Sequence, residues 1–230
     1  MSRMDYYPLL LSLKVAFLAT LFTFVLGLLA AQLTVKLRHG KGILDGLFTL
    51  PLVLPPTVVG FFLLVIFGVN SFIGRFLDKI GASVIFSWTG AVIASTVVSF
   101  PLMYRTARGA FEQMDENLLN AGRTLGMTEQ ELFFRVTLPN SIPSVMAGTI
   151  LAFARALGEF GATIMLAGNI PHRTQTVSIA IYSAVQAGDW DTAYRWTGII
   201  ICISFVTILL MNWWTKLAAG TKRKAGRSWR

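Results

Sequence analysis

Two ionisable residues stand four positions apart inside one apolar run of this sequence. They are Arg155 and Glu159, in the stretch from Leu151 to Thr176. An ionisable group within a membrane is costly and is a candidate functional residue by default. The spacing of four places both side chains on one face of a helix. Two interpretations stay open: an ion pair that ties the helix to its neighbours, or an Arg155 that lines a path for anions while Glu159 holds it or gates access.

A second candidate group is formed by prolines. The stretch "LPLVLPPTVVG", from Leu50 to Gly60, places Pro51, Pro55 and Pro56 in an apolar run. Proline interrupts the hydrogen-bond ladder of a helix, and a membrane tolerates such backbone only where neighbouring helices or a water-lined cavity satisfy it. The pattern fits either a simple kink or a broken helix beside a path. We therefore take these prolines, with Arg155 and Glu159, as candidates for a translocation path or gate.

Catalysis is not indicated by the remaining polar residues. His39 and His172 fall in loops predicted on opposite sides of the membrane, and Glu159 is the one acid within a predicted span. No catalytic constellation and no metal site is therefore expected, which argues against a membrane-embedded enzyme. A secondary transporter would show inverted repeats and more intramembrane carboxylates. The sequence shows neither, which argues against that class as well. The sequence also lacks the P-loop pattern Gly, four residues, Gly-Lys, then Ser or Thr, so we expect no bound ATP or other cofactor on this chain.

The composition defines the elements that must position these residues. Of 230 residues, 54% are hydrophobic and 13% charged, and the mean hydropathy is +0.64. These values predict an all-α integral membrane protein. The formal net charge of +9 would suggest nucleic acid in a soluble protein, but here the cytoplasmic excess of Lys and Arg explains it. The single cysteine, Cys202, excludes an intrachain disulfide.

Runs of about 20 apolar residues predict the spanning helices. The first run is too long for the core of a signal peptide and follows a single Arg3, so it is taken as a span, with a cleaved signal as the alternative. Five spans are predicted, over Leu9 to Val35, Leu47 to Gly68, Phe86 to Tyr104, Ile142 to Gly168, and Trp196 to Leu217.

The distribution of positive charge predicts the orientation. With the N-terminus outside, the inside segments 36–46, 105–141 and 216–230 hold thirteen Lys and Arg residues and the outside segments hold four. The positive-inside rule therefore places the N-terminus outside and the C-terminus inside. The basic tail from Thr221 to Arg230 is expected to touch anionic lipid and not nucleic acid. The inside residues are Lys36, Arg38, Lys41, Arg105, Arg108, Arg123, Arg135, Lys216, Lys222, Arg223, Lys224, Arg227 and Arg230, and the outside ones Arg3, Arg75, Lys79 and Arg173.

The predicted cytoplasmic segment 105–141 is unusually polar for this chain. Within it, apolar residues recur at helical spacing, which predicts short amphipathic helices near the membrane surface. The segment from Asn120 to Pro139 also matches a known pattern: Glu-Ala-Ala, three residues, Gly, nine residues, then Ile, one residue, Leu-Pro. The matching positions are Asn120, Ala121, Gly122, Gly126, Val136, Leu138 and Pro139, with Asn, Gly and Val replacing the usual Glu, second Ala and Ile.

This segment resembles the cytoplasmic loop of ABC importer permeases. The resemblance implies a coupling helix that docks in a groove of a separate ATPase subunit. Ala121, Gly122 and Gly126 would allow close approach, and Leu118, Leu125 and Met127 would supply apolar contact. The same resemblance includes Asn120, Leu138 and Pro139 in this coupling loop. ATP and Mg would then be used by the partner ATPase.

The proline stretch and the sequence Gly-Glu-Phe-Gly-Ala-Thr around Glu159 are similar to permeases of the molybdate and sulfate oxyanion importers, and closer to the molybdate ones. The similarity extends from about Leu10 to beyond Trp196. It implies a type I ABC importer permease fold, with 1–230 as one transmembrane domain in the bacterial inner membrane. The implied partners are a second copy of the chain, two ATPase subunits and a periplasmic or lipid-anchored molybdate-binding protein. Sulfate, thiosulfate or tungstate is the alternative substrate.

The outside segment from Gly168 to Tyr194 contains a further apolar stretch, "TVSIAIYSAVQAG". It is too short to span a bilayer, so we expect a re-entrant or surface helix there. By resemblance, the external loops would receive the loaded binding protein, although loop packing explains these residues equally well.

Overall fold

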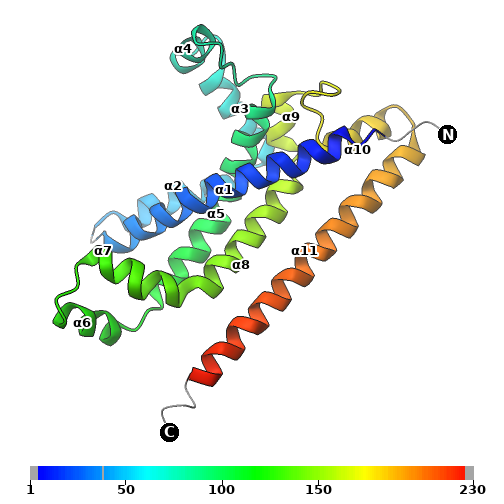
Figure 1. Ribbon diagram of the computed structural model, residues 1–230. Helices are drawn as coiled ribbons and strands as arrows, with labels where there is room; N and C mark the ends of the chain where they lie inside the picture. Colours follow the sequence, from blue (N-terminus) through cyan, green and yellow to red (C-terminus); the bar gives the residue numbers. More distant parts are fainter. Residues whose placement is uncertain (1–4, 38, 226–230) are drawn as a thin grey trace.

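The computed structural model describes residues 5–37 and 39–225, with side chains up to residue 213. Every regular element in those ranges is helical (Figure 1). Of the basic tail, 226–230 lie outside this description, and for 221–225 only the backbone is described. The elements are α1 (Tyr7–Lys36), α2 (Lys41–Val53), α3 (Pro56–Phe67), α4 (Phe72–Lys79), α5 (Trp88–Glu112), α6 (Glu116–Thr124), α7 (Glu129–Leu132), the π-helix η1 (Phe133–Thr137), α8 (Leu138–Leu157), α9 (Gly161–Ala167), α10 (Val177–Gln186) and α11 (Trp190–Ala225).

The centre of the bundle is α5, which packs against α1 on one side and α8 on the other. Small residues bring these helices close together. A Cβ atom on Gly27 of α1 would lie 3.3 Å from the Tyr104 backbone nitrogen, and one on Gly148 of α8 would lie 2.9 Å from the Thr106 Cβ atom. The three helices therefore form a tight core, and the long α11 lies along its side (Figure 1), reaching it through α8 and α10.

The predicted span from Leu47 to Gly68 is broken into two helices. α2 and α3 meet at an angle of 111°, so the kink interpretation is wrong. Leu54 is extended, with ψ of 142°, and Pro55 is extended, with ψ of 134°. A residue that precedes proline is forced out of the helical region, and here two such residues follow one another. Pro51, in contrast, lies inside α2.

The predicted span from Ile142 to Gly168 is also broken, and its prediction as one helix is wrong. α8 ends at Leu157 and α9 begins at Gly161. Glu159 therefore lies in the connection between two helices and not within a helix. At its other end, α8 continues from α7 and η1, so the helical stretch begins at Glu129, well before Ile142.

Three helical stretches of the described chain are long and apolar enough to cross a membrane, or four if the bent α2–α3 pair counts as one. They are Tyr7–Lys36, Glu129–Leu157 and Trp190–Trp213. α5 is 25 residues long but is not among them, because its Ser, Thr and Arg residues make it less apolar. The chain is thus a multi-helix membrane protein, and the number of spans and their orientation stay predictions.

The segments 36–46 and 105–141, both predicted inside, do lie at one end of the bundle, since Arg108 of α5 contacts Asp45 of α2. The predicted short helices of this region are present as α6 and α7. The predicted short helix of the outside segment is present as α10, whose Val177 N–H donates to the Ser12 hydroxyl at 2.8 Å. α10 packs against α11 and α1, so it is tied to the bundle, and its re-entrant or surface position stays a prediction.

Candidate functional site

The two broken helices meet close to their breaks. A Cβ atom on Gly161, the first residue of α9, would lie 3.0 Å from the Pro56 Cβ atom and 3.2 Å from the Thr57 nitrogen. One on Gly60 would lie 2.7 Å from the Ala162 Cα atom. The start of α3 and the start of α9 therefore touch backbone to backbone. We call this contact, formed by 54–60 and 158–163, the junction.

Glu159 lies at the centre of the junction and is only 2% exposed. Its Oε1 atom accepts a hydrogen bond from the Ala162 N–H at 2.8 Å, which satisfies one free donor at the start of α9. Its Oε2 atom lies 2.6 Å from Nη1 of Arg155. This second contact is an ion pair without hydrogen-bond geometry, since Oε2 has no hydrogen-bond partner among the described residues. Arg155 and Glu159 are therefore paired, and the pair is compatible with both interpretations of these residues.

Polar groups gather at the same place. Thr163, four residues beyond Glu159, is 1% exposed and its hydroxyl has no partner in the described part of the chain. Among the predicted prolines, Pro56 is in the junction, Pro55 caps α3 and is exposed, and Pro51 lies one turn back along α2. The five predicted path residues therefore divide: Pro55, Pro56 and Glu159 form the breaks, while Pro51 and Arg155 lie on the adjoining helices.

The second candidate region, α6 and α7 with their connection, is held by local interactions. The Asp115 carboxylate caps α6 by accepting from the Asn117 N–H, and Thr128 and Glu131 form a reciprocal capping box at α7. Between the helices Gly126 has φ of +80°, a conformation in which other residues are strained. The chain therefore makes a sharp turn at this glycine.

Arg123 ties the two short helices together. Its Nε donates to Glu129 Oε1 at 2.9 Å, and its Nη1 donates to Asn120 Oδ1 at 2.9 Å. The hydrogen bond to Glu129 raises the pKa of Arg123 above its ordinary value. Asn120, the residue that departs from the Glu of the family pattern, thus orients Arg123.

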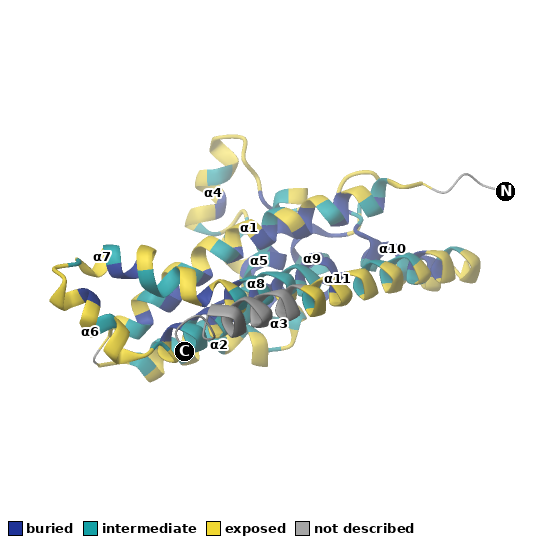
Figure 2. Ribbon diagram, turned by 60° about the horizontal axis from the view of Figure 1, so that its bottom comes forward, coloured by how far each residue is buried: buried dark blue, intermediate teal, exposed yellow. Residues whose placement is uncertain are grey.

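The predicted coupling residues differ in exposure. Leu125 is 83% exposed, and Leu118, Asn120, Ala121, Gly126 and Pro139 are also exposed, whereas Met127 and Leu138 are half-buried. Gly122 is buried, because it packs against Leu132 of α7, whose side-chain end an added Cβ atom would have to displace. Its small size thus serves contact within the chain. Figure 2 shows the outer faces of α6 and α7 as largely exposed.

One ionic group near this region was not among the predicted residues. Arg108 of α5 contacts the Asp45 carboxylate of α2, donates to Glu112 Oε1 at 3.0 Å, and donates to the Tyr104 hydroxyl at 3.4 Å. The spacing of Arg108 and Glu112 is a helical i, i+4 pair visible in the sequence. Asp45 lies 63 positions from Arg108 in the chain, so its contact with Arg108 could be found only from the structure.

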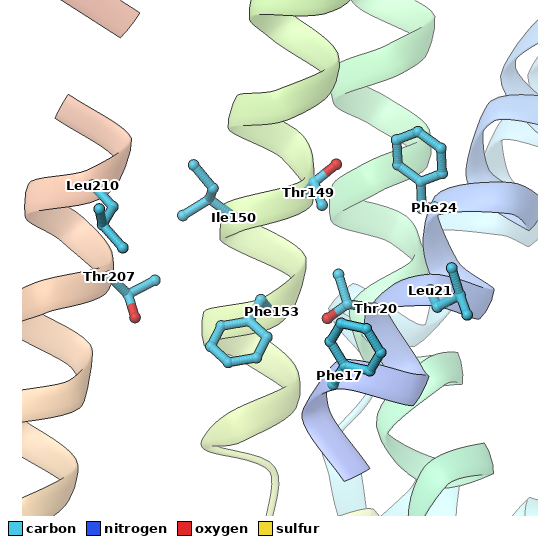
Figure 3. Close-up of a pocket in the computed structure, with 9 residues that line it drawn as sticks. All are labelled: Phe17, Thr20, Leu21, Phe24, Thr149, Ile150, Phe153, Thr207 and Leu210. Carbon is cyan, nitrogen blue, oxygen red and sulfur yellow. The ribbon is translucent and has the colours of Figure 1, made fainter. Parts of the chain in front are cut away.

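A large groove between α1, α8 and α11 does not suit an anion. It has a volume of about 390 Å³. Three threonines line it, but each donates its hydroxyl to the carbonyl four residues back on its own helix, so the wall presents carbon. An anion there would lose its hydration without compensation. The lining residues, drawn in Figure 3, are Phe17, Thr20, Leu21, Phe24, Thr149, Ile150, Phe153, Thr207 and Leu210.

Comparison with known sequences decides between the classes that the geometry leaves open. Residues 23–222 match the family described as binding-protein-dependent transport system inner membrane component. The chain belongs to this family. It is therefore a non-catalytic membrane component of a transport system, and not a membrane-embedded enzyme.

Several members of this family are similar over most of their length. The molybdenum transport system permease protein ModB of Escherichia coli K12 is 46% identical over 226 residues, 97% of each chain. The putative molybdenum transport system permease protein YvgM of Bacillus subtilis is 46% identical over 89% of this chain and 91% of its own. The sulfate transport system permease protein CysT of Salmonella typhimurium is 36% identical over 87% of this chain and 73% of its own.

Solved structures show the same fold. A bacterial ABC transporter for import of the acidic polysaccharide alginate has a chain with a TM-score of 0.76 and 17% identity, covering 94% of this chain and 80% of that one. An inward-facing MetNI methionine ABC transporter has one with a TM-score of 0.75 and 15% identity, covering 95% and 99%. The fold is thus that of ABC transporter permeases.

Proposed function

We propose that this chain is the permease subunit of an ATP-driven importer that moves molybdate across the bacterial inner membrane. The observation that carries the proposal is the nearly full-length identity with molybdenum permeases, which exceeds that with sulfate permeases. The chain would bind no cofactor of its own. ATP and Mg would be used by two partner ATPase subunits.

The α6–α7 loop supports docking on such an ATPase. Its apolar side chains Leu118, on α6, and Leu125, which follows the last residue of α6, are exposed. Exposed leucines on a short, locally braced helix are the type of anchor that fits a groove of another protein. Movement of the docked loops on ATP binding and hydrolysis would alternate the permease between outward-open and inward-open states.

The anion path would be formed by two copies of the chain. The groove within one copy has an apolar wall, which does not suit an anion. The buried polar groups Glu159 and Thr163 of that copy lie instead at the junction. We place the path beside the junction, with Arg155 as the cation that admits an oxyanion and with the external end of the dimer receiving a molybdate-binding protein. Because Arg155 already pairs with Glu159, its attraction for the anion would be moderate, which permits release.

Uptake of labelled molybdate by bacteria that lack this chain, with and without the restored chain, tests the proposal. We expect uptake only with the chain, blocked by excess tungstate and unaffected by excess sulfate. Association with an ATPase subunit in detergent extracts would be measured on the same cells.

Sulfate import is the second candidate, because CysT proteins are also similar over most of this chain. Sulfate uptake that depends on the chain, without molybdate uptake, would show that the proposed substrate is wrong while the permease role is right. If uptake of neither anion depends on the chain, and no ATPase is associated with it, the importer proposal is overturned.

A further inference from the structure

The short helix α4 has two chemically different faces. Phe72, Phe76 and Ile80 follow one another at intervals of four and are 82%, 58% and 60% exposed. Arg75 and Lys79, also four apart, stand on the adjacent face. Positions four apart share a face of a helix, so the apolar and cationic residues form separate stripes.

The apolar stripe cannot turn inward. Gly74, on the opposite side of α4, packs against the Gly68 carbonyl so closely that any side chain would collide. The Ser71 hydroxyl caps the helix by accepting from the Gly74 N–H at 2.7 Å and also donates to the Ile66 carbonyl. Leu77 packs against the core cluster of α3, α5 and α9. These contacts fix the rotation of α4 about its axis, with the phenylalanines outward.

The position of α4 continues an apolar surface of the membrane helices. It follows the end of α3, whose exposed residues include Phe62, Val65 and Ile66, with Val69 in the connection. In Figure 1 α4 projects to the side of the bundle, near the end of α3, and in Figure 2 its outer surface is exposed. A bilayer that meets this apolar surface would have its boundary near α4.

The cations of α4 have no acidic partner among the described residues. Arg75 Nε donates only to the Ser71 carbonyl, at 3.3 Å, and Lys79 forms no ion pair in that part of the chain. α4 thus presents two unpaired cations beside a stripe of exposed aromatic and aliphatic side chains. This pattern is complementary to a surface in which anionic groups adjoin hydrocarbon. That is the composition of a phospholipid interface.

We propose that α4 is an interfacial helix that binds anionic phospholipid. Phe72, Phe76 and Ile80 enter the boundary between headgroups and acyl chains, and Arg75 and Lys79 contact lipid phosphates. The helix thereby fixes the α3 end of the bent α2–α3 pair at the membrane surface. This inference is independent of the transported substrate.

Collision accessibility of a spin label tests the depth of α4. The label is placed at Phe76→Cys in a Cys202→Ser background, with the full chain in nanodiscs of equal parts phosphatidylcholine and phosphatidylglycerol. We expect collisions with oxygen to exceed those with a water-soluble nickel chelate several-fold. A label at Leu125→Cys is the water-exposed control. Greater access to nickel would place α4 in water, and low access to both probes would place it against a second copy or another protein; either result overturns the proposal.

A second measurement tests the charges. Arg75→Gln with Lys79→Gln should lower the preference for phosphatidylglycerol over phosphatidylcholine by roughly tenfold, measured by native mass spectrometry of retained lipid. The matched control is Arg173→Gln, another exposed arginine at the same predicted side. A loss no greater than that of the control would overturn the phosphate contact.

Discussion

The junction and the α6–α7 loop are built by opposite means. In the junction, backbones touch, Gly60 and Gly161 leave no room for a side chain, and a carboxylate is buried. In the loop, caps and the Arg123–Glu129 ion pair hold two small helices, and Leu118 and Leu125 stay exposed. The junction is thus specified by close packing within the chain, while the loop exposes the apolar surface that we propose for a partner. Substitutions in the first should act through stability and those in the second through association.

The largest effect on stability is expected for Gly60→Leu. A Cβ atom there meets backbone of α9, which cannot move aside as a flexible side chain could, so we expect a loss of roughly 3 kcal/mol or more, with little protein in the membrane. Gly198→Leu on α11, where nothing lies within 4 Å of an added Cβ atom, is the control and should accumulate normally. Size-exclusion chromatography of detergent extracts measures both, and equal recovery would contradict the described junction.

Arg155→Gln should have the next largest effect. It leaves the buried Glu159 carboxylate without its cation, and because Arg155 is itself 30% exposed we expect about 2–3 kcal/mol, below the range for a fully buried pair. Thermal unfolding in detergent measures the loss. The double variant Arg155→Gln with Glu159→Gln should recover most of it, since the neutral amide at position 159 needs no cation and its oxygen can still accept from the Ala162 N–H.

The same variant separates the two interpretations of Arg155. Normal unfolding temperature and membrane level with abolished molybdate uptake would mean that Arg155 acts on the path and adds little to stability. Poor accumulation that the double variant repairs would mean that the ion pair is structural.

A smaller effect is expected for Thr128→Ala in the loop. It removes the capping box of α7 and should cost about 1 kcal/mol locally, measured as faster hydrogen exchange of residues 129–132. The other end of α7 continues into η1 and α8, so loss of the cap should loosen only the first turn. The free energy of global unfolding should therefore change little. A large fall in the unfolding temperature would show that the loop is part of the core and would remove the contrast with the junction.

The smallest effect on stability is expected for Leu125→Ala. Its side chain is almost fully exposed, so the unfolding free energy should change by no more than about 0.5 kcal/mol. If Leu125 is a docking anchor, association with the ATPase subunit should weaken by roughly tenfold. Gln113→Ala, also exposed but at the C-terminal end of α5, is the control. Unchanged association would leave Leu125 without a docking role.

The sequence predicts the parts of this molecule that depend on local chemistry. Two consecutive prolines mark the position of the break before α3, although the sequence leaves a kink and a broken helix open. The helical spacing of apolar residues in 105–141 predicts α6 and α7, and the spacing of Arg155 and Glu159 permits their ion pair. The break between α8 and α9 has no proline to mark it, and apolar residues continue on both sides, so it is not distinguishable from a span. The contact of Arg108 with Asp45 and that of Gly161 with Pro56 join segments far apart in the chain, and neither has a local signal.

The π-helix η1 adds a different property to the loop. A π turn holds about one residue more than the corresponding α turn. Removal of one residue between Phe133 and Thr137 would therefore restore α geometry and keep α7 close to its present rotation relative to α8. Removal of one residue from the regular α8 would instead rotate α7 by about 100° relative to the rest of that helix. The π turn thus absorbs one extra residue without changing the direction in which the loop faces, whereas a deletion within α8 would redirect the loop while leaving every side chain of α6 unchanged.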